Sequence, residues 1–265
     1  MALLPVMAGA RFARPLVSAT FIRRLNRFAA LVQVNGRDER VHVRNSGRLR
    51  ELLVPGRPVL LEPAHREGRR TRFTLALVRL AGGYVSVDAH LPNALVEAGL
   101  RWGGVPGCRG YRFLRREPAM GRKRADFLLG RGNRRCLVEV KSVTLIEGGV
   151  ALFPDAPTAR GRSHLEHLIA ACGQGLEAAV LFVIQRTDAT ALAPNRRTDP
   201  AFAAALMRAR RAGVRIRAMT CRITRAGVWL AGTVPVRLAA ERDRPSVIPV
   251  RRVKEVDTGA LRRLG

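Results

Sequence analysis

"RCLVEVKSVTL", residues 135–145, is the stretch that decides how the second half of this chain folds. Its apolar residues are typical of a buried strand, but Glu139 and Lys141 interrupt them. Side chains two positions apart on a strand lie on the same face, so the acid and the base are expected side by side. Charged groups at the edge of a core need a chemical reason, and the neighbouring segments supply a candidate.

The residues before this stretch predict the other strand of a hairpin. "RADFLLG" (124–130) is typical of a strand, and the "RGN" that follows predicts a turn. Antiparallel pairing across that turn brings Asp126 opposite Glu139. Two carboxylates and the Lys141 ammonium then converge at one place.

Converging carboxylates are hard oxygen ligands, which suit Mg²⁺ or Mn²⁺. We therefore predict that Asp126 and Glu139 are metal ligands and that Lys141 is a catalytic cation. The metal would polarise a phosphodiester, and the lysine would orient the attacking water or neutralise charge on phosphorus. The alternative is a solvated Glu–Lys pair, because the bare pattern is common and such pairs contribute little.

The elements around the hairpin alternate between strands and helices. We predict further strands at 149–155, 177–186, 214–224 and 228–237, and helices at 158–175 and 199–213. Asp199 and Pro200 are the expected N-cap and first residue of the second helix. An Asp followed after about a dozen residues by Glu-x-Lys, within such an order, is the arrangement of the PD-(D/E)xK nuclease fold.

The first half of the chain is typical of an all-β domain. Five short β segments are expected at 27–36, 39–45, 58–64, 71–80 and 84–91, with one helical turn at 47–53. They predict an OB-like barrel, although another small barrel or sandwich fits the pattern as well. The fold class is thus a two-domain α+β / α/β protein. Its expected parts are a loose N-terminal extension (1–14), the OB-like barrel (15–90), a nuclease-like domain (91–237) and a poorly ordered basic tail (238–265).

The charge of the chain points to a polyanionic partner. The 48 basic and 20 acidic residues leave a net charge of +28, which attracts nucleic acid and, more weakly, an anionic membrane surface. Two groups are candidate DNA contacts, each with a solvated surface as the alternative. They are Arg23, Arg24, Arg27, Arg44 and Arg48 in the barrel, and Arg160, Arg162 and His164 where the first long helix begins.

Several single residues have two interpretations. Asp155 is either a third acid near the metal or part of the cap of the helix that follows. Gln185 ends its strand and either reaches the site or merely terminates the strand. Trp102 and Trp229 are expected to pack in the core or at the barrel rim.

Location and assembly follow from composition alone. The four cysteines lack CxxC spacing, which argues against a zinc site or disulfides and fits a reducing cytoplasm. No stretch approaches the roughly 18 apolar residues of a membrane span, so no membrane partner is expected. A nucleoid-associated protein of the cytoplasm is the resulting hypothesis, with a homodimer left open.

"FPDAPTARGRSHL" (153–165) closely resembles a signature of the sugar fermentation stimulation protein family. "HVRNSGRLRELLVPG" (42–56) and the strand around Glu139 are similar to other blocks of that family, and the resemblance runs from about residue 15 to 237. It implies an OB-like domain, a nuclease-like domain, non-specific DNA binding and a link to maltose metabolism. It also places the family's upstream glutamate on Glu117 as a further metal ligand.

Three functions fit these observations. The first is a metal-dependent deoxyribonuclease. The second is a catalytically inactive DNA-binding regulator on a nuclease scaffold, although no helix-turn-helix is evident. The third is a basic RNA-binding protein, which the aromatic content of only 5% disfavours because single-strand RNA binding relies on aromatic platforms.

Overall fold

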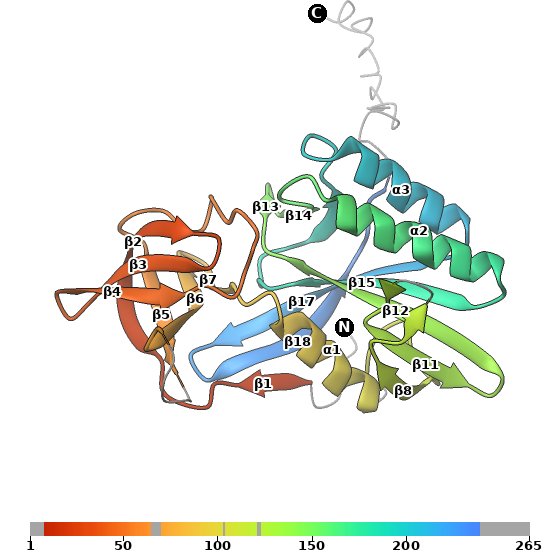
Figure 1. Cartoon of the computed structure of the whole chain (residues 1–265), viewed down its shortest axis with the longest axis horizontal. Coiled ribbons are helices and arrows are strands. Elements are labelled where there is room, and N and C mark those ends of the chain that lie inside the picture. Colours follow the sequence, from red (N-terminus) through yellow and green to blue (C-terminus); the bar gives the residue numbers. More distant parts are fainter. Residues whose placement is uncertain (1–7, 65–69, 103, 121–122, 239–265) are drawn as a thin grey trace, which may run out of the picture.

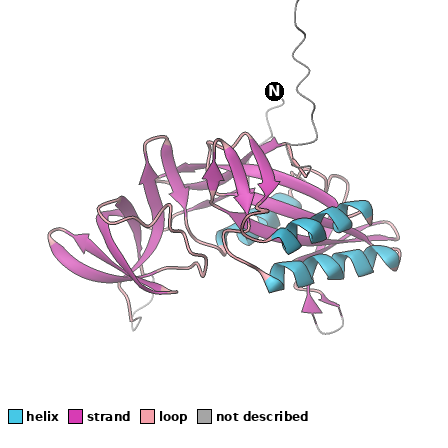
Figure 2. Cartoon of the chain, turned by 90° about the horizontal axis from the view of Figure 1, so that it is seen from above, coloured by secondary structure: helices cyan, strands magenta, loops and turns pink. Residues whose placement is uncertain are grey.

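The computed structural model describes residues 8–64, 70–102, 104–120 and 123–238. These residues form two domains, a β-barrel and a larger αβ domain (Figure 1). All helices of the described part belong to the αβ domain, as Figure 2 shows. The tail predicted at 238–265 lies outside the described residues apart from Leu238.

The barrel is built from consecutive antiparallel strands. They are β2 (Val17–Asn26), β3 (Ala29–Val34), β4 (Arg37–His42), β5 (Pro58–Pro63), β6 (Phe73–Leu80) and β7 (Gly83–Ser86). The sheet order is β4-β3-β2-β5-β6-β7, and a further pairing of His42 with Thr74 joins β4 to β6. This pairing closes five strands around a core that includes Phe21, Val32 and Leu75, so the predicted OB-like barrel is confirmed.

One strand of the barrel was missed, and one local prediction is confirmed. The first barrel strand is β2, which we had not predicted. The helical turn expected at 47–53 is present, because Leu53 N donates to Leu49 O, four residues back, at 2.8 Å. Strand β2 carries arginines, and its pairing with β3 shifts register between Phe21 and Arg23 and between Arg24 and Asn26. Such bulges interrupt the alternation by which a strand is recognised in a sequence.

The αβ domain is organised around a seven-stranded mixed sheet of order β1-β18-β17-β15-β12-β11-β8. The strands are β1 (Gly9–Arg11), β8 (Arg112–Arg116), β11 (Phe127–Arg131), β12 (Arg134–Val143), β15 (Glu177–Ile184), β17 (Arg215–Thr224) and β18 (Gly227–Val234). The central β12, β15 and β17 are parallel, and the outer pairs are antiparallel. The expected loose extension at 1–14 therefore supplies an edge strand, β1, to this sheet.

Helices cover both faces of the sheet. α1 (Leu91–Arg101) packs through Leu95, Val96 and Leu100 on one face, while α2 (Ala159–Gly173) and α3 (Pro200–Arg211) pack on the other. Asp199 caps α3 as predicted, because its side chain accepts from Phe202 N at 2.8 Å. No helix in the described residues is long and apolar enough to cross a membrane.

Short strands complete the domain. They are β9 (Ala119–Met120) with β10 (Lys123–Arg124), and a small sheet of β13 (Ile146–Glu147), β14 (Val150–Phe153) and β16 (Ala191–Pro194).

Hydrogen bonds tie the two domains together beside the end of β15. Gln185, which is fully buried, donates through Nε2 to Asp88 O and Ser142 Oγ at 3.0 Å each. Its own carbonyl accepts from Ser86 N at 3.3 Å. Farther along, Asp155 Oδ2 accepts from Arg48 N at 3.0 Å. Gln185 is thus a link between the domains, and the two ties flank the cleft described next.

Candidate metal and nucleic-acid site

The β11–β12 hairpin has the predicted register. Phe127 pairs with Val138 and Arg131 with Arg134, so Asp126, one residue before β11, faces Glu139. Asp126 N donates to Val138 O at 3.1 Å, which continues the ladder to this position. The local sequence therefore places the two carboxylates on neighbouring strands, as expected.

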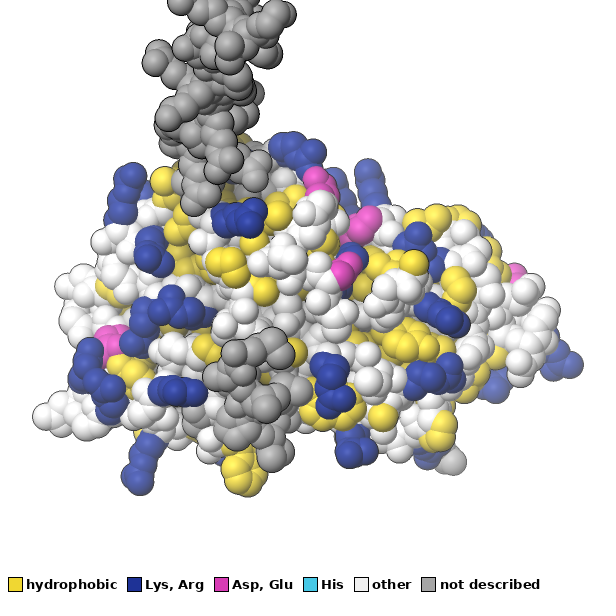
Figure 3. Space-filling view, turned by 180° about the vertical axis from the view of Figure 1, so that it is seen from behind, with side chains coloured by type: hydrophobic (Ala, Val, Ile, Leu, Met, Phe, Trp, Pro, Cys, Tyr) yellow, Lys and Arg dark blue, Asp and Glu magenta, His cyan; other side chains and the backbone are white. Residues whose placement is uncertain are grey.

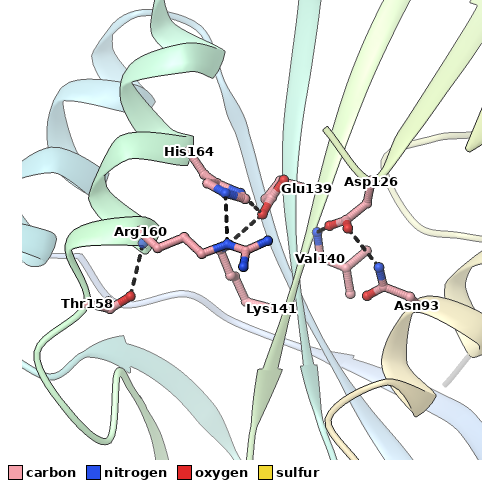
Figure 4. A network of polar contacts seen from close by, with 9 residues as sticks. Asn93, Asp126, Glu139, Val140, Lys141, Thr158, Arg160 and His164 are labelled. Carbon is pink, nitrogen blue, oxygen red and sulfur yellow. Dashed lines mark hydrogen bonds and ion pairs between the residues drawn. The ribbon is translucent and has the colours of Figure 1, made fainter. Parts of the chain in front are cut away.

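Asp126 is held by two donors, one of them from α1 (Figure 4). Asn93 Nδ2 donates to its Oδ1 and Val140 N to its Oδ2, both at 2.7 Å. Burial, and then the nearby charge of Glu139, raise the pKa of Asp126 above its usual value despite these hydrogen bonds. Asn93 was not predicted, because an amide in the first turn of a helix carries no signal of a partner 33 residues away.

Glu139 is only 3% exposed, yet it is the better stabilised of the two carboxylates. Its Oε1 accepts from Lys141 Nζ at 2.6 Å and contacts His164 Nδ1 of α2. Burial by itself raises the pKa of Glu139, but the His164 hydrogen bond and the Lys141 charge outweigh it, and the pKa lies below its usual value. Arg160 Nε donates to His164 Nε2 at 3.4 Å, which leaves the proton of a neutral imidazole on Nδ1, facing Glu139.

These contacts shift the pKa values of two facing carboxylates in opposite directions, and perturbed carboxylates of this kind are typical of sites with acid–base or metal chemistry. Burial and then the charge of Glu139 raise the pKa of Asp126, and a divalent cation would relieve the second effect, so the donor chemistry fits a hard metal ion. The described residues contain no group of three or more His, Cys, Asp or Glu side chains placed to hold a metal. The fit is therefore to an ion that takes one or two carboxylates and keeps waters and substrate oxygens, as Mg²⁺ commonly does.

The other two predicted acids lie apart from this pair. Glu117 is exposed, and its carboxylate accepts from Arg124 Nη1 at 3.3 Å; only its backbone approaches the site, donating from N to Asp126 O at 2.8 Å. Asp155 accepts from Arg48 N across the domain interface. The cap of α2 is Thr158, whose Oγ1 accepts from Gly161 N, so Asp155 does not cap the helix.

A cleft of about 680 Å³ opens beside Lys141 between the two domains. The barrel contributes Arg27 and Asn45 to its lining, and the αβ domain contributes Thr158 and Arg160. A second hollow of about 800 Å³ shares Arg27 with the cleft and adds further barrel arginines. Lys and Arg side chains are scattered over the face seen in Figure 3, where Asp and Glu side chains are fewer.

The candidate DNA-binding residues divide into two groups. Arg23, Arg27, Arg48 and Arg160 are exposed. Arg24 instead directs its guanidinium inward: it donates to the carbonyls of Asn26, Arg27, Asn45, Gly47 and Arg48. All five N–H groups are thus used within the barrel, so Arg24 supports the loop and has no donor left for a phosphate.

Three further candidate DNA-binding residues also have partners within the protein. Arg162 Nη1 donates to Asp199 Oδ2 at 2.7 Å, which joins α2 to the cap of α3. Arg44 pairs with Asp88 at 3.1 Å. His164 lies on Glu139. The sequence missed these partners because they lie far away along the chain.

The two tryptophans differ from each other. Trp102, at the end of α1, is 85% exposed, so the expectation that it packs in the core or at the barrel rim was wrong. Trp229 lies on β18, where Arg222 stacks over its ring.

Comparisons with known proteins bear on both domains. The model of the SfsA N-terminal OB domain matches residues 22–87, and the model of the sugar fermentation stimulation protein RE domain matches residues 90–227. A sugar fermentation stimulation protein homolog of Moorella thermoacetica is 47% identical over 225 residues, 84% of this chain and 97% of that protein. The homolog of Chloroflexus aurantiacus is 45% identical over 232 residues, 88% of each chain.

A solved structure is similar over both domains. It is that of Pyrococcus furiosus SfsA in complex with Ca²⁺, with a TM-score of 0.80 and 31% sequence identity. The match covers 89% of this chain and 100% of that one.

Proposed function

The chain belongs to the sugar fermentation stimulation protein family, and we propose that it binds DNA and hydrolyses its phosphodiester bonds with a divalent metal ion. The observation that carries this proposal is the facing pair Asp126 and Glu139 beside Lys141, which lines a basic cleft. A purely structural Glu–Lys pair would not need a second, half-buried carboxylate opposite it.

Asp126 and Glu139 are the proposed ligands of Mg²⁺ or Mn²⁺. A relative of 31% identity has been solved in complex with Ca²⁺, which supports a divalent site in this fold. When bound, such an ion polarises a phosphodiester and lowers the pKa of a bound water. Asn93 and Val140 N orient Asp126, and the His164 hydrogen bond favours the ionised form of Glu139.

Lys141 is the proposed catalytic cation. Its Nζ lies 2.6 Å from Glu139 Oε1, and its side chain also lines the cleft. An ammonium at that position stabilises negative charge that develops on a phosphate in the cleft or orients a water toward it. Glu139 thus holds the lysine in place as well as serving as a ligand.

The proposed DNA contacts are exposed arginines of the cleft and of the adjoining hollow of about 800 Å³. Arg27 and Arg48 extend from the barrel and Arg160 from α2. Guanidinium contacts to phosphates do not read bases, so binding is proposed to be independent of sequence. A nucleoid-associated protein of the cytoplasm follows from this proposal, while a role in sugar metabolism rests on the family name.

Cleavage of single-stranded, duplex and branched DNA with Mg²⁺ or Mn²⁺ tests the proposal. Asp126→Ala and Lys141→Ala should each reduce cleavage by about 10²–10³-fold or more, with DNA affinity retained. Glu166→Ala is the matched control, because it removes an exposed carboxylate of α2 that pairs with Arg208 of α3. Salt-sensitive binding without cleavage under any metal would favour a DNA-binding regulator on a nuclease scaffold. Absence of binding would overturn the proposal.

A further inference from the structure

The turn between β2 and β3 presents an aromatic side chain on a fixed backbone. Phe28 is 50% exposed, unlike the barrel phenylalanine Phe21, which is 2% exposed. Phe28 N donates to Asn26 Oδ1 at 2.8 Å, and Phe28 O accepts from Val43 N at 2.9 Å. Arg24 Nη2 donates to the carbonyl of Arg27 at 2.6 Å. The ring is therefore held at the surface by three hydrogen bonds to its turn.

Phe28 lines a hollow of about 400 Å³ on the outside of the barrel. The other side chains of this hollow are mostly nitrogen donors. They are Asn26, Arg40, His42 and Arg70, with Ala29 and Thr71. No carboxylate lies among the described residues of this lining. An exposed aromatic face among cationic and amide groups is the chemistry that takes a nucleobase and its phosphate.

This hollow is linked to the proposed catalytic cleft by shared lining residues. Asn26 lines both the Phe28 hollow and the hollow of about 800 Å³, and that hollow shares Arg27 with the cleft beside Lys141. The Asn26–Phe28 turn thus presents Arg27 on one side and the Phe28 ring on the other. A DNA strand with a phosphate at Lys141 can follow three adjoining hollows to the Phe28 ring.

Only an unpaired base fits the end of this path. Bases of an intact duplex stack on each other and offer only their edges, whereas an aromatic side chain stacks on the face of a base. We propose that Phe28 is a stacking platform for an unpaired base, and that DNA with a single-stranded segment is the substrate class of this protein. This inference rests on the function proposed above and adds a specific subsite to it.

Affinity for a single-stranded dT oligonucleotide and for a blunt duplex of equal length tests the inference. Fluorescence anisotropy at one fixed salt concentration, with EDTA to prevent cleavage, gives both dissociation constants. Phe28→Ala should weaken single-strand binding about tenfold and change duplex binding less than about twofold. Phe28→Leu keeps an apolar side chain and should behave like Phe28→Ala, whereas Phe28→Tyr should retain wild-type affinity.

A spectroscopic arm reports stacking directly. In Phe28→Trp, the oligonucleotide should quench more tryptophan fluorescence than it does in the wild type, which carries only Trp102 and Trp229. Wild-type affinity in Phe28→Leu, equal losses for single strand and duplex, or no added quenching would each overturn the stacking role. If the wild type binds duplex DNA and the Phe28 substitutions change no affinity, this inference alone is refuted. If the wild type binds neither the single strand nor the duplex, the proposed function is refuted as well.

Discussion

Helix α2 touches two buried carboxylate sites that differ in how their charge is balanced. At its start, Thr158 N and Arg162 Nη1 donate to Asp199, at 2.8 and 2.7 Å. One turn further on, His164 contacts Glu139, which faces Asp126 across the hairpin. The Asp199 site has one carboxylate and several donors, whereas the hairpin site places two carboxylates against each other.

The difference separates a structural site from a functional one. The hydrogen bonds and charge around Asp199 outweigh the effect of its burial, and its pKa is lowered. The pKa of Asp126 is raised by burial and by Glu139. A carboxylate whose charge is stabilised by the fold contributes to stability, whereas a carboxylate with a raised pKa, such as Asp126, costs stability when it is ionised and is ready to bind a cation.

The largest expected effect comes from removing the structural carboxylate. Asp199→Ala removes the α3 cap and leaves Thr158 N and Arg162 without their acceptor, so the free energy of unfolding should fall by about 2–4 kcal/mol. Urea denaturation measures it. Glu147→Ala is the matched control, since Glu147 and its partner Arg197 are both exposed, and its loss should cost at most about 1 kcal/mol. Equal losses in the two variants would contradict the contrast.

Removing the Asn93 hydrogen bond to Asp126 should instead reduce metal affinity strongly and stability only slightly. Asn93→Ala is expected to weaken Ca²⁺ or Mn²⁺ binding by about 10–100-fold, as is usual for groups that orient a metal ligand. The stability loss should stay near about 1 kcal/mol, because one hydrogen bond is lost. Calorimetric titration gives the affinity, and Gln33→Ala, an exposed amide of the barrel, is the control. Unchanged cation affinity in Asn93→Ala would argue against Asp126 as a metal ligand.

Lowering the pH should change the contributions of Asp199 and Asp126 to the free energy of unfolding in opposite directions. The lowered pKa of Asp199 means that its contribution is present above the unfolded pKa of Asp and is lost as the pH falls through the folded one. The stability gap between wild type and Asp199→Ala should therefore narrow from about pH 5 downward.

The raised pKa of Asp126 has the reverse consequence. Its ionisation costs stability as the pH rises from the unfolded pKa through the folded one, so without metal Asp126→Ala should gain relative to wild type over that range. Urea titrations in EDTA at several pH values measure both trends. Parallel trends for Asp126 and Asp199 would contradict the assignment of one site to function and the other to structure.

The smallest expected effects concern two arginines, of which Arg27 is proposed to bind DNA and Arg24 supports the barrel. Arg27→Ala should weaken DNA binding a few-fold and reduce the slope of log K against log[salt] by about 0.9, with stability unchanged. Arg24→Ala should instead lower stability by about 1–3 kcal/mol, because five carbonyl contacts are lost. Anisotropy at several salt concentrations, together with urea denaturation, separates the two. A stable Arg24→Ala with only a reduced salt slope would show that Arg24 does contact phosphate.

The predictable part of this protein is the part determined by near neighbours. The alternating strands and the turn at Gly132 placed Asp126 opposite Glu139, and Asp199 followed by Pro200 marked the start of α3. Pleat, turn and cap depend on residues a few positions apart, so a sequence contains them directly. Strand β2 was missed even at this scale, because its bulges break the alternation.

Tertiary structure alone decided which side chains complete the site and which are used elsewhere. Asn93 and His164 reach the carboxylates across 33 and 25 positions, and Arg24 bonds a loop more than 20 residues away. Their positions depend on how helices and domains pack on the sheet. That packing is set by the apolar contacts of the whole core, and no local pattern records it.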